Sequence, residues 1–181
     1  NLSLSPQFKD LRPFLWHNYH KPTNDKFQLS LRYTSYQNIE ELNSLPKAFE
    51  SNRIFRNLET IRQRNLREAT KEKAQFLLSD DFDKLLKNYR NTLGPNSKDI
   101  FNKCERMKEL MQGLQSLKIG QLYSVLSPND QVIYQVFFAW DRKRAYYLFG
   151  AGETENKERY QGTFAFWSAM KMLAQKGVKY I

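Results

Sequence analysis

The sequence predicts an α+β domain, and two features of its 181 residues carry that prediction. The middle of the chain has helical periodicity in three long segments. The part after Gly120 contains three short segments rich in Val, Phe and Tyr, which are typical of strands. Hydrophobic residues make up 40% of the chain and aromatic residues 14%, which is enough to build a core. We therefore expect a mixed sheet flanked by helices.

Residues 1–26 are expected to form an extended arm ahead of a domain at residues 27–181. The arm combines aromatic residues with three prolines and has neither helical nor alternating periodicity. Residues 27–33 alternate apolar and polar side chains, as a half-buried strand does. Residues 38–45 predict a short helix, because Asn38 can serve as its N-cap and a proline follows its end.

Residues 52–73 predict a longer helix with two contrasting faces. Apolar side chains share one face at helical spacing: Ile54, Leu58, Ile61 and Ala69. Five cations project within a sector of about 80° on the other side, and no Glu of the segment falls inside it: Arg53, Arg56, Arg64, Arg67 and Lys71. Two interpretations stay open, an ordinary solvent-facing surface and a surface that binds phosphate groups. The second would use Arg56, Arg64, Arg67 and Lys71.

A strand and two further helices are expected next. Residues 74–79 predict a short strand. The following helix starts at Asp80 or Asp81 and ends at Gly94. Residues 97–118 predict another helix, whose stripe of Met and Cys side chains is expected to pack in the core rather than bind a metal or a redox group.

The C-terminal third predicts an antiparallel meander followed by a helix. Turn residues separate three strand-like segments, residues 121–127, 131–140 and 144–153. A turn with one glycine then leads into an amphipathic helix that Gly177 ends, and residues 178–181 begin a fourth strand. Because the chain starts at Asn1 and stops on an apolar half-strand with an unpaired edge, we expect that it lacks sequence at both ends.

With this order of elements the chain resembles the FemAB-like acyltransferases, which have the GNAT fold of the acyl-CoA N-acyltransferases. The resemblance rests on residues 65–94, 120–162 and 164–181, where three antiparallel strands, a helix and a further strand follow one another. It implies that this chain is the second of two such domains. The arm would then cross between the domains, and an N-terminal half-domain would belong to the same protein.

The turn before the last helix matches part of the GNAT pattern [RQ]-x-x-G-x-[GA], which holds the pyrophosphate of acyl-CoA in that fold. Here residues 159–164 read Arg-Tyr-Gln-Gly-Thr-Phe, so that Phe164 stands where the pattern has a small residue. Free amides and the dipole of a helix N-terminus attract anions in general. The resemblance therefore implies a donor-binding role for Arg159, Gln161, Gly162 and Thr163, and an ordinary loop-to-helix junction is the alternative.

Acyl transfer to an amine requires a proton acceptor and hydrogen-bond donors for the developing oxyanion. The resemblance implies that amides of residues 145–150 hold the acyl carbonyl, that Tyr146 or Tyr147 acts as a general acid, and that Glu153 accepts a proton. The sequence has no Ser-His-Asp or Cys-His pattern, so a covalent intermediate is not expected. Both histidines lie in the arm without a nearby Cys or a cluster of carboxylates, so no metal site is expected.

The chain has 29 Lys and Arg against 19 Asp and Glu, and its net charge of +10 favours anionic partners such as nucleic acid, nucleotide phosphates or an anionic membrane. Together with the resemblance, this predicts transfer of an acyl or aminoacyl group to a primary amine, in the modification of peptidoglycan or other cell-envelope precursors. The donor would be acyl-CoA or aminoacyl-tRNA, and the setting cytoplasmic. Two alternatives stay open: an acyl-CoA-dependent N-acetyltransferase, and a non-catalytic basic module that binds nucleic acid or anionic lipid.

Overall fold

The computed structural model describes residues 10–30, 35–43, 49–93, 98–153 and 158–181, with only the backbone of residues 93 and 98–101. Its internal contacts divide the chain into two units, Asn1–Tyr36 and Gln37–Ile181. Each unit is described by itself.

The smaller unit contains the short helix α1 (Arg12–Leu15). The ring of Phe27 packs edge-on against that of Phe14, with ring centroids 5.4 Å apart. The strand expected at residues 27–33 is not seen in residues 27–30, which are irregular, and residues 31–34 lie outside the described residues.

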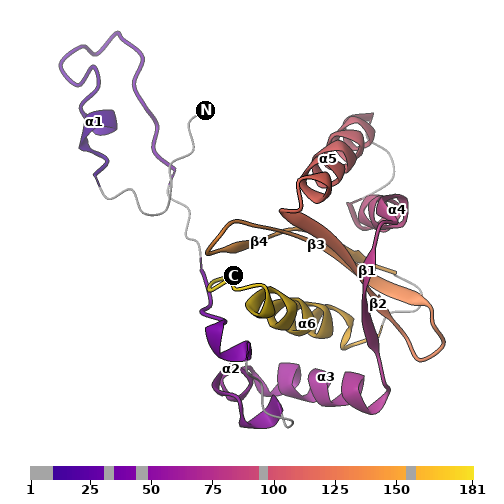
Figure 1. Cartoon of the computed structure of the whole chain (residues 1–181). Coiled ribbons are helices and arrows are strands. Elements are labelled where there is room, and N and C mark those ends of the chain that lie inside the picture. The colour runs from indigo at the N-terminus through magenta and orange to yellow at the C-terminus, as the bar shows by residue number, and fades with distance from the viewer. Residues whose placement is uncertain (1–9, 31–34, 44–48, 94–97, 154–157) are drawn as a thin grey trace. The chain divides into compact units, whose positions relative to one another are not determined.

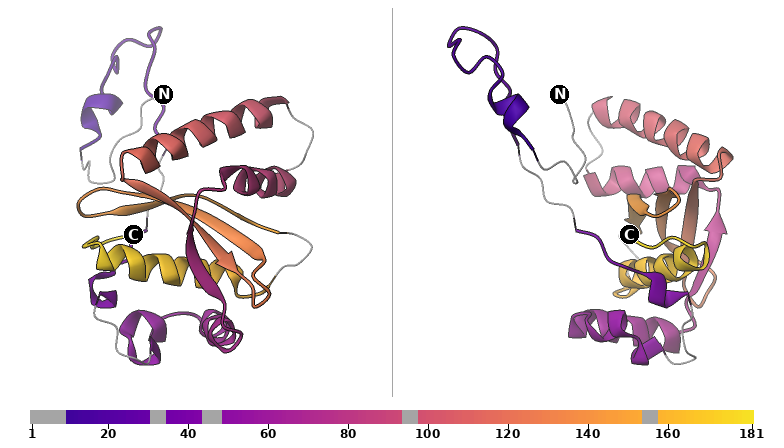
Figure 2. Two further views of the ribbon diagram at one scale, coloured as in Figure 1. Left: turned by 45° about the vertical axis from the view of Figure 1, so that its right-hand side comes forward. Right: turned by 60° about the vertical axis from the view of Figure 1, so that its left-hand side comes forward.

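The larger unit is built on a four-stranded sheet with helices over both faces (Figures 1 and 2). Its strands are β1 (Gln75–Ser79), β2 (Gly120–Leu126), β3 (Val132–Trp140) and β4 (Ala145–Gly152). Neighbouring strands run antiparallel in the order β1-β2-β3-β4. The predicted meander and the α+β class are therefore confirmed.

Three helices lie directly on the sheet. The helices α4 (Phe82–Leu93) and α5 (Lys98–Ser116) cover one face, and α6 (Gln161–Gln175) covers the other (Figure 2). The remaining elements pack around α6: α2 (Arg53–Arg56), α3 (Thr60–Lys71) and the short 3-10 helices η1 (Glu40–Leu42) and η2 (Phe49–Ser51). Asp81 caps α4 as predicted, since its Oδ1 accepts a hydrogen bond from the amide of Lys84 at 2.9 Å.

Both faces of β3 are buried, in agreement with its apolar sequence. Phe138 packs in the cluster under α6 and Phe137 in the cluster under α4 and α5, and neither side chain is exposed. Gln135 is the polar exception on this strand. Its Nε2 donates to the carbonyl of Asp81 at 3.2 Å and to Ser124 Oγ at 3.1 Å, so the amide ties the start of α4 to the sheet.

The helix predicted at residues 52–73 is interrupted, so that prediction is wrong in one respect. The helix α2 ends at Arg56, Glu59 has an extended backbone, and α3 begins at the next residue. Gln63 Nε2 donates to the carbonyls of Arg56 at 3.2 Å and Leu58 at 2.9 Å. These bonds satisfy carbonyl groups that the interruption leaves without helical partners.

The interruption changes the helical register of everything that follows it. Ile61 was expected to face inward but is 44% exposed, whereas Leu66 and Ala69 are buried. Because α2 and α3 are separate helices, their cations do not share the single sector of about 80° that a continuous helix would give them.

Residues 178–181 follow a glycine stop and join the sheet only in part. Gly177 has a φ of +87°, as its predicted role at the helix end requires. Tyr180 then forms a parallel bridge with Arg144 at the start of β4 and an antiparallel bridge with Asn38. The expectation of an unpaired edge is therefore corrected: backbone hydrogen bonds of 2.8–3.0 Å join residues 37–39 to residues 179–181.

We expect Gly120→Ala to lower the free energy of unfolding by about 1–3 kcal/mol, the usual range for overpacking. A Cβ at residue 120 would lie 2.7 Å from Phe137 Cζ and 2.8 Å from Leu114 Cβ. Gly113→Ala in α5 is the matched control, because nothing lies within 4 Å of its added Cβ. It should gain about 0.5–1 kcal/mol from helix propensity. Urea denaturation compares the two, and equal stability of both variants would contradict the packing described here.

A second prediction concerns Tyr123, which is fully buried and whose hydroxyl has no hydrogen-bond partner among the described residues. Burial raises the pKa of Tyr123 to about 12. The pKa in the unfolded chain is about 10, so this phenol does not make the free energy of unfolding depend on pH below about pH 10, and it lowers that free energy as the pH rises from about 10 towards 12. We expect Tyr123→Phe to be as stable as the original chain at neutral pH, or about 1 kcal/mol more stable, and to lose less stability above pH 10. Denaturant unfolding across this pH range measures both, and parallel losses would refute the prediction.

Candidate functional site

The outer edge of β4 is paired only near its start. The amide of Ala145 donates to the carbonyl of Tyr180 at 2.8 Å. Beyond this residue, no strand in the described part of the chain pairs with that edge. The strand edge that the sequence analysis proposed for holding an acyl carbonyl is therefore open over most of its length.

A β-bulge shapes this open strand. Phe138 pairs with Tyr147 and Phe137 pairs with Phe149, which leaves Leu148 as an extra residue on β4. The bulge places Tyr147 and, three residues later, Gly150 on the face that α6 covers. Bulges commonly redirect side chains next to binding sites.

Tyr134 of β3 lies at the centre of this face. A Cβ on Gly152 would lie 2.7 Å from its ring, one on Gly150 would lie 3.0 Å from its hydroxyl, and one on Gly162 would lie 4.0 Å from its ring. The two glycines of β4 thus leave room for the Tyr134 side chain, which reaches the first turn of α6. Burial first, and then electrostatic interaction with Tyr147, raises the pKa of Tyr134 well above its usual value, so its phenol stays protonated.

The two predicted general acids lie on opposite faces of β4. Tyr147 belongs to the α6 face, where its ring packs 4.9 Å from that of Phe166. Tyr146 points the other way and donates to Asp141 Oδ2 at 3.0 Å. Only Tyr147 is therefore close to both the α6 face and Tyr134. Glu153 forms an ion pair with Lys84 of α4 at 3.0 Å, so its carboxylate is already engaged by a cation.

The N-terminus of α6 contains the predicted donor-binding residues. In the described part of the chain, the amides of Gly162 and Thr163 have no hydrogen-bond acceptor, whereas the amide of Phe164 bonds to the carbonyl of Tyr160 at 2.8 Å. Gly162 has no positive φ, and a Cβ there would meet nothing closer than 4.0 Å. Neither the backbone nor the packing requires this glycine. Phe164, which stands where the GNAT pattern has a small residue, packs against the core.

The other residues of the turn have different surroundings. Gln161 is buried, and an added Cβ on Gly152 would lie 2.5 Å from its Nε2, so its side chain packs inward against β4. The Arg159 side chain is exposed, while its carbonyl accepts a hydrogen bond from Asn65 Nδ2 at 3.1 Å. The helix α3 thus fixes the turn before α6.

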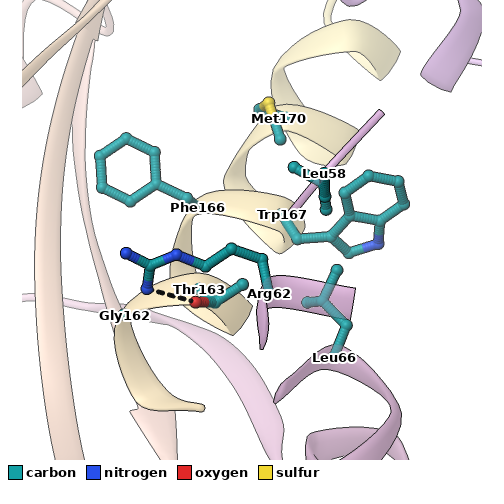
Figure 3. A pocket seen from close by; sticks show the side chains of 8 residues that line it. All are labelled: Leu58, Arg62, Leu66, Gly162, Thr163, Phe166, Trp167 and Met170. Atoms are coloured by element: carbon teal, nitrogen blue, oxygen red, sulfur yellow. Dashed lines mark hydrogen bonds between the residues drawn. The ribbon is translucent and has the colours of Figure 1, made fainter. Parts of the chain in front are cut away.

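A groove of about 410 Å³ opens between α3 and the first three turns of α6 (Figure 3). Arg62 extends from α3 to α6, where its Nη1 donates to Thr163 Oγ1 at 3.2 Å (Figure 3). The sequence analysis missed Arg62, because it lay outside the sector of cations. A detectable signal existed: Arg62 stands four residues before buried Leu66 and four after half-buried Leu58, so it is a cation within an apolar stripe.

The cations predicted to bind phosphate are only partly available. Arg67 lies 3.6 Å from a carboxylate oxygen of Glu50, and its guanidinium lies 5.3 Å from the ring centroid of Phe55. The predicted sector of cations contained no Glu from the same helical segment, but Glu50 belongs to the segment that precedes it. The other three cations of the predicted set are exposed and form no ion pair with the described residues: Arg56, Arg64 and Lys71.

The described residues contain no cluster of three or more His, Cys, Asp or Glu side chains that could hold a metal ion. In the same residues, no helix has the length and apolar character needed to cross a membrane.

No protein-family model and no curated protein matches the chain. Among solved structures, the chain is similar to FemX with a TM-score of 0.61 and 13% identity, over 80% of this chain and 50% of FemX. It is also similar to the C-terminal domain (DUF2156) of a putative lysylphosphatidylglycerol synthetase from Agrobacterium fabrum. That similarity has a TM-score of 0.46 and 12% identity, over 68% of this chain and 39% of the other. The chain thus spans about half the length of FemX.

The likeness to FemX, a FemAB-family protein, confirms the fold that the resemblance to FemAB-like acyltransferases implied. At 13% identity it shows the fold alone, and the function has to be argued from the site. The larger unit of this chain has the α+β, GNAT-like fold of FemX.

Proposed function

We propose that the larger unit transfers an aminoacyl or acyl group to a primary amine. The observation that carries this proposal is the position of Tyr134, which lies between Gly162 at the N-terminus of α6 and Gly150 on β4. A helix end suited to a phosphate group and an open strand edge suited to a carbonyl are therefore neighbours. The fold shared with FemX supports a transferase at this coarse level.

The donor would bind with its phosphate at the amides of Gly162 and Thr163. These amides are free in the described residues, and the helix dipole adds a favourable potential for an anion. The exposed cation of Arg159 lies in the adjoining turn and Arg62 on the neighbouring helix. Gln161 would contribute by holding α6 against β4 rather than by touching the donor.

In the proposed reaction, the amine nitrogen attacks the donor carbonyl, which accepts hydrogen bonds from outward-facing amides near the bulge at Leu148. The tetrahedral intermediate then expels the donor oxygen or sulfur, and a proton passes from the amine to that leaving group. Tyr147 is suited to donate this proton, because its hydroxyl lies near that of Tyr134, whose phenol stays protonated. Glu153 is the candidate proton acceptor, and accepting a proton requires it to part from Lys84.

Aminoacyl-tRNA is our preferred donor. The exposed cations Arg56, Arg64 and Lys71 offer phosphate contacts that a long RNA could use, in addition to the site on α6. Acyl-CoA is the alternative donor for the same site. The same proposal has a peptidoglycan or other cell-envelope precursor as the acceptor and places the reaction in the cytoplasm. It also includes association with an anionic membrane surface and a companion half-domain in the same protein.

The neighbouring tyrosines of β4 test the chemistry. We expect Tyr147→Phe to lower the rate of aminoacyl transfer about 100-fold, the lower range for a lost general acid. Tyr146→Phe is the matched control and should change the rate less than about twofold, because its hydroxyl bonds to Asp141 on the other face. The assay follows label transfer from aminoacyl-tRNA, and in parallel from acyl-CoA, to a lysine-bearing cell-wall precursor peptide. A larger loss with Tyr146→Phe would overturn the assignment.

Thr163→Asp separates donor binding from stability. The new carboxylate can still accept the hydrogen bonds of Arg62 and Asn65, and an acid in the first turn stabilises a helix by about 0.3–1 kcal/mol. We therefore expect unchanged or higher stability but a loss of affinity for coenzyme A or aminoacyl-tRNA of about tenfold or more, since like charges repel. Thr163→Ser should keep both properties. Fluorescence titration measures the affinity, and undiminished donor binding by Thr163→Asp would contradict the site.

A charge-reversal series distinguishes an enzyme from a binding module. If the chain only binds nucleic acid or anionic lipid, Arg56→Glu and Arg64→Glu should weaken binding in a salt-dependent way, with no transfer to lose. If it is an enzyme, the same variants should mainly raise the concentration of aminoacyl-tRNA needed for transfer. Transfer that is absent with every donor, combined with such binding, would favour the module.

A further inference from the structure

We propose that the groove between α3 and α6 binds a fatty-acid anion, with its hydrocarbon chain against the apolar wall and its carboxylate at Arg62. The groove shares Arg62, Gly162 and Thr163 with the proposed donor site, but binding of a fatty acid does not require the transfer reaction. The proposal gives a role to the apolar side chains of the groove, which neither the strand edge nor the predicted donor-binding turn explains.

The wall of the groove is apolar along its length. Leu58, Leu66, Phe166, Trp167 and Met170 line it, and Figure 3 shows the Phe166 and Trp167 rings on its two sides. Leu58, Leu66 and Phe166 have no hydrogen-bonding atom, and the Met170 thioether accepts only weakly. A nucleobase or a peptide would leave several polar groups without partners on such a wall, at a cost for each group. A hydrocarbon chain leaves none.

The polar groups of the groove gather at one end and are donors. Thr163 Oγ1 accepts hydrogen bonds from Arg62 Nη1 at 3.2 Å and from Asn65 Nδ2 at 3.5 Å, so its own proton is free to point at a ligand. A guanidinium has five N–H donors in a planar fork, and the described residues use one of them here. Among the residues that the structure describes, no acidic side chain lines the groove.

This charge distribution fits a carboxylate. A guanidinium can hold the two oxygens of a carboxylate with two parallel hydrogen bonds, and such charged bonds are among the stronger ones in proteins. A volume of about 410 Å³ lies in the range of small-molecule pockets, and an extended chain suits a groove that runs from Thr163 towards Met170. The ligand is therefore linear, apolar and anionic at one end.

The test is calorimetric titration of the full chain with hexanoate, octanoate, decanoate and dodecanoate below their micelle concentrations. We expect the affinity to rise about fourfold for each added methylene until the groove is full, and then to level off. Dodecylamine has the same chain with the opposite charge and should bind at least about tenfold more weakly than dodecanoate.

Two variants of α3 locate the binding. Arg62→Leu keeps an apolar side chain, removes the cation, and should weaken dodecanoate binding about 10- to 100-fold, the loss expected for charged hydrogen bonds. Arg64→Leu, on the exposed side of the same helix, should leave it unchanged. Equal binding of dodecanoate by both variants, equal binding of dodecylamine, or binding of adenosine monophosphate in place of dodecanoate would each overturn the proposal. The calorimetric titration contains no acyl donor and no amine acceptor. Its result therefore does not depend on whether the chain has transfer activity.

Discussion

The site depends on one packing constraint: β4 carries no side chain at Gly150 and Gly152, where Tyr134 approaches both positions and α6 approaches the second. An added Cβ at Gly152 would lie 2.5 Å from Gln161 and 2.7 Å from Tyr134, and one at Gly150 would lie 2.7 Å from the hydroxyl of Tyr147. These distances are shorter than non-bonded carbon contacts allow. The missing side chain at Gly152 therefore lets Gln161, in the first turn of α6, pack against β4, and the one at Gly150 leaves room for the hydroxyls of Tyr134 and Tyr147.

Much of the fold could be predicted from local sequence signals. The apolar run of β3, the turns between the strands, Asp81 at the start of α4 and Gly177 after α6 are each local features, and the structure has each of them where it was expected. The stripe of Met and Cys side chains in α5 also packs in the core, since Cys104, Met107 and Met111 are buried there. Periodicity and capping act over a few residues, so one sequence is enough to read them.

The site required information that local patterns do not contain. The helix α2 ends at Arg56, directly after the buried Ile54 and Phe55, and this break invalidated an arrangement of cations built on one continuous helix. A sector of cations also cannot reveal acids from other segments, such as Glu50 beside Arg67. The sequence named Tyr146 and Tyr147 together, and adjacent residues of a strand face opposite sides. Only the structure shows that Tyr147 is the one on the α6 face.

The central claim is that one ligand contacts the N-terminus of α6 and the bulged part of β4 at the same time. Backbone amide NMR of the chain, titrated with coenzyme A and separately with an aminoacylated RNA minihelix, tests this claim most directly. The account predicts that, with one of these ligands, the resonances of Gly162, Thr163 and residues 147–150 shift together at the lowest concentrations. Shifts confined to Arg56, Arg64 and Lys71, with both parts of the site unchanged, would contradict it.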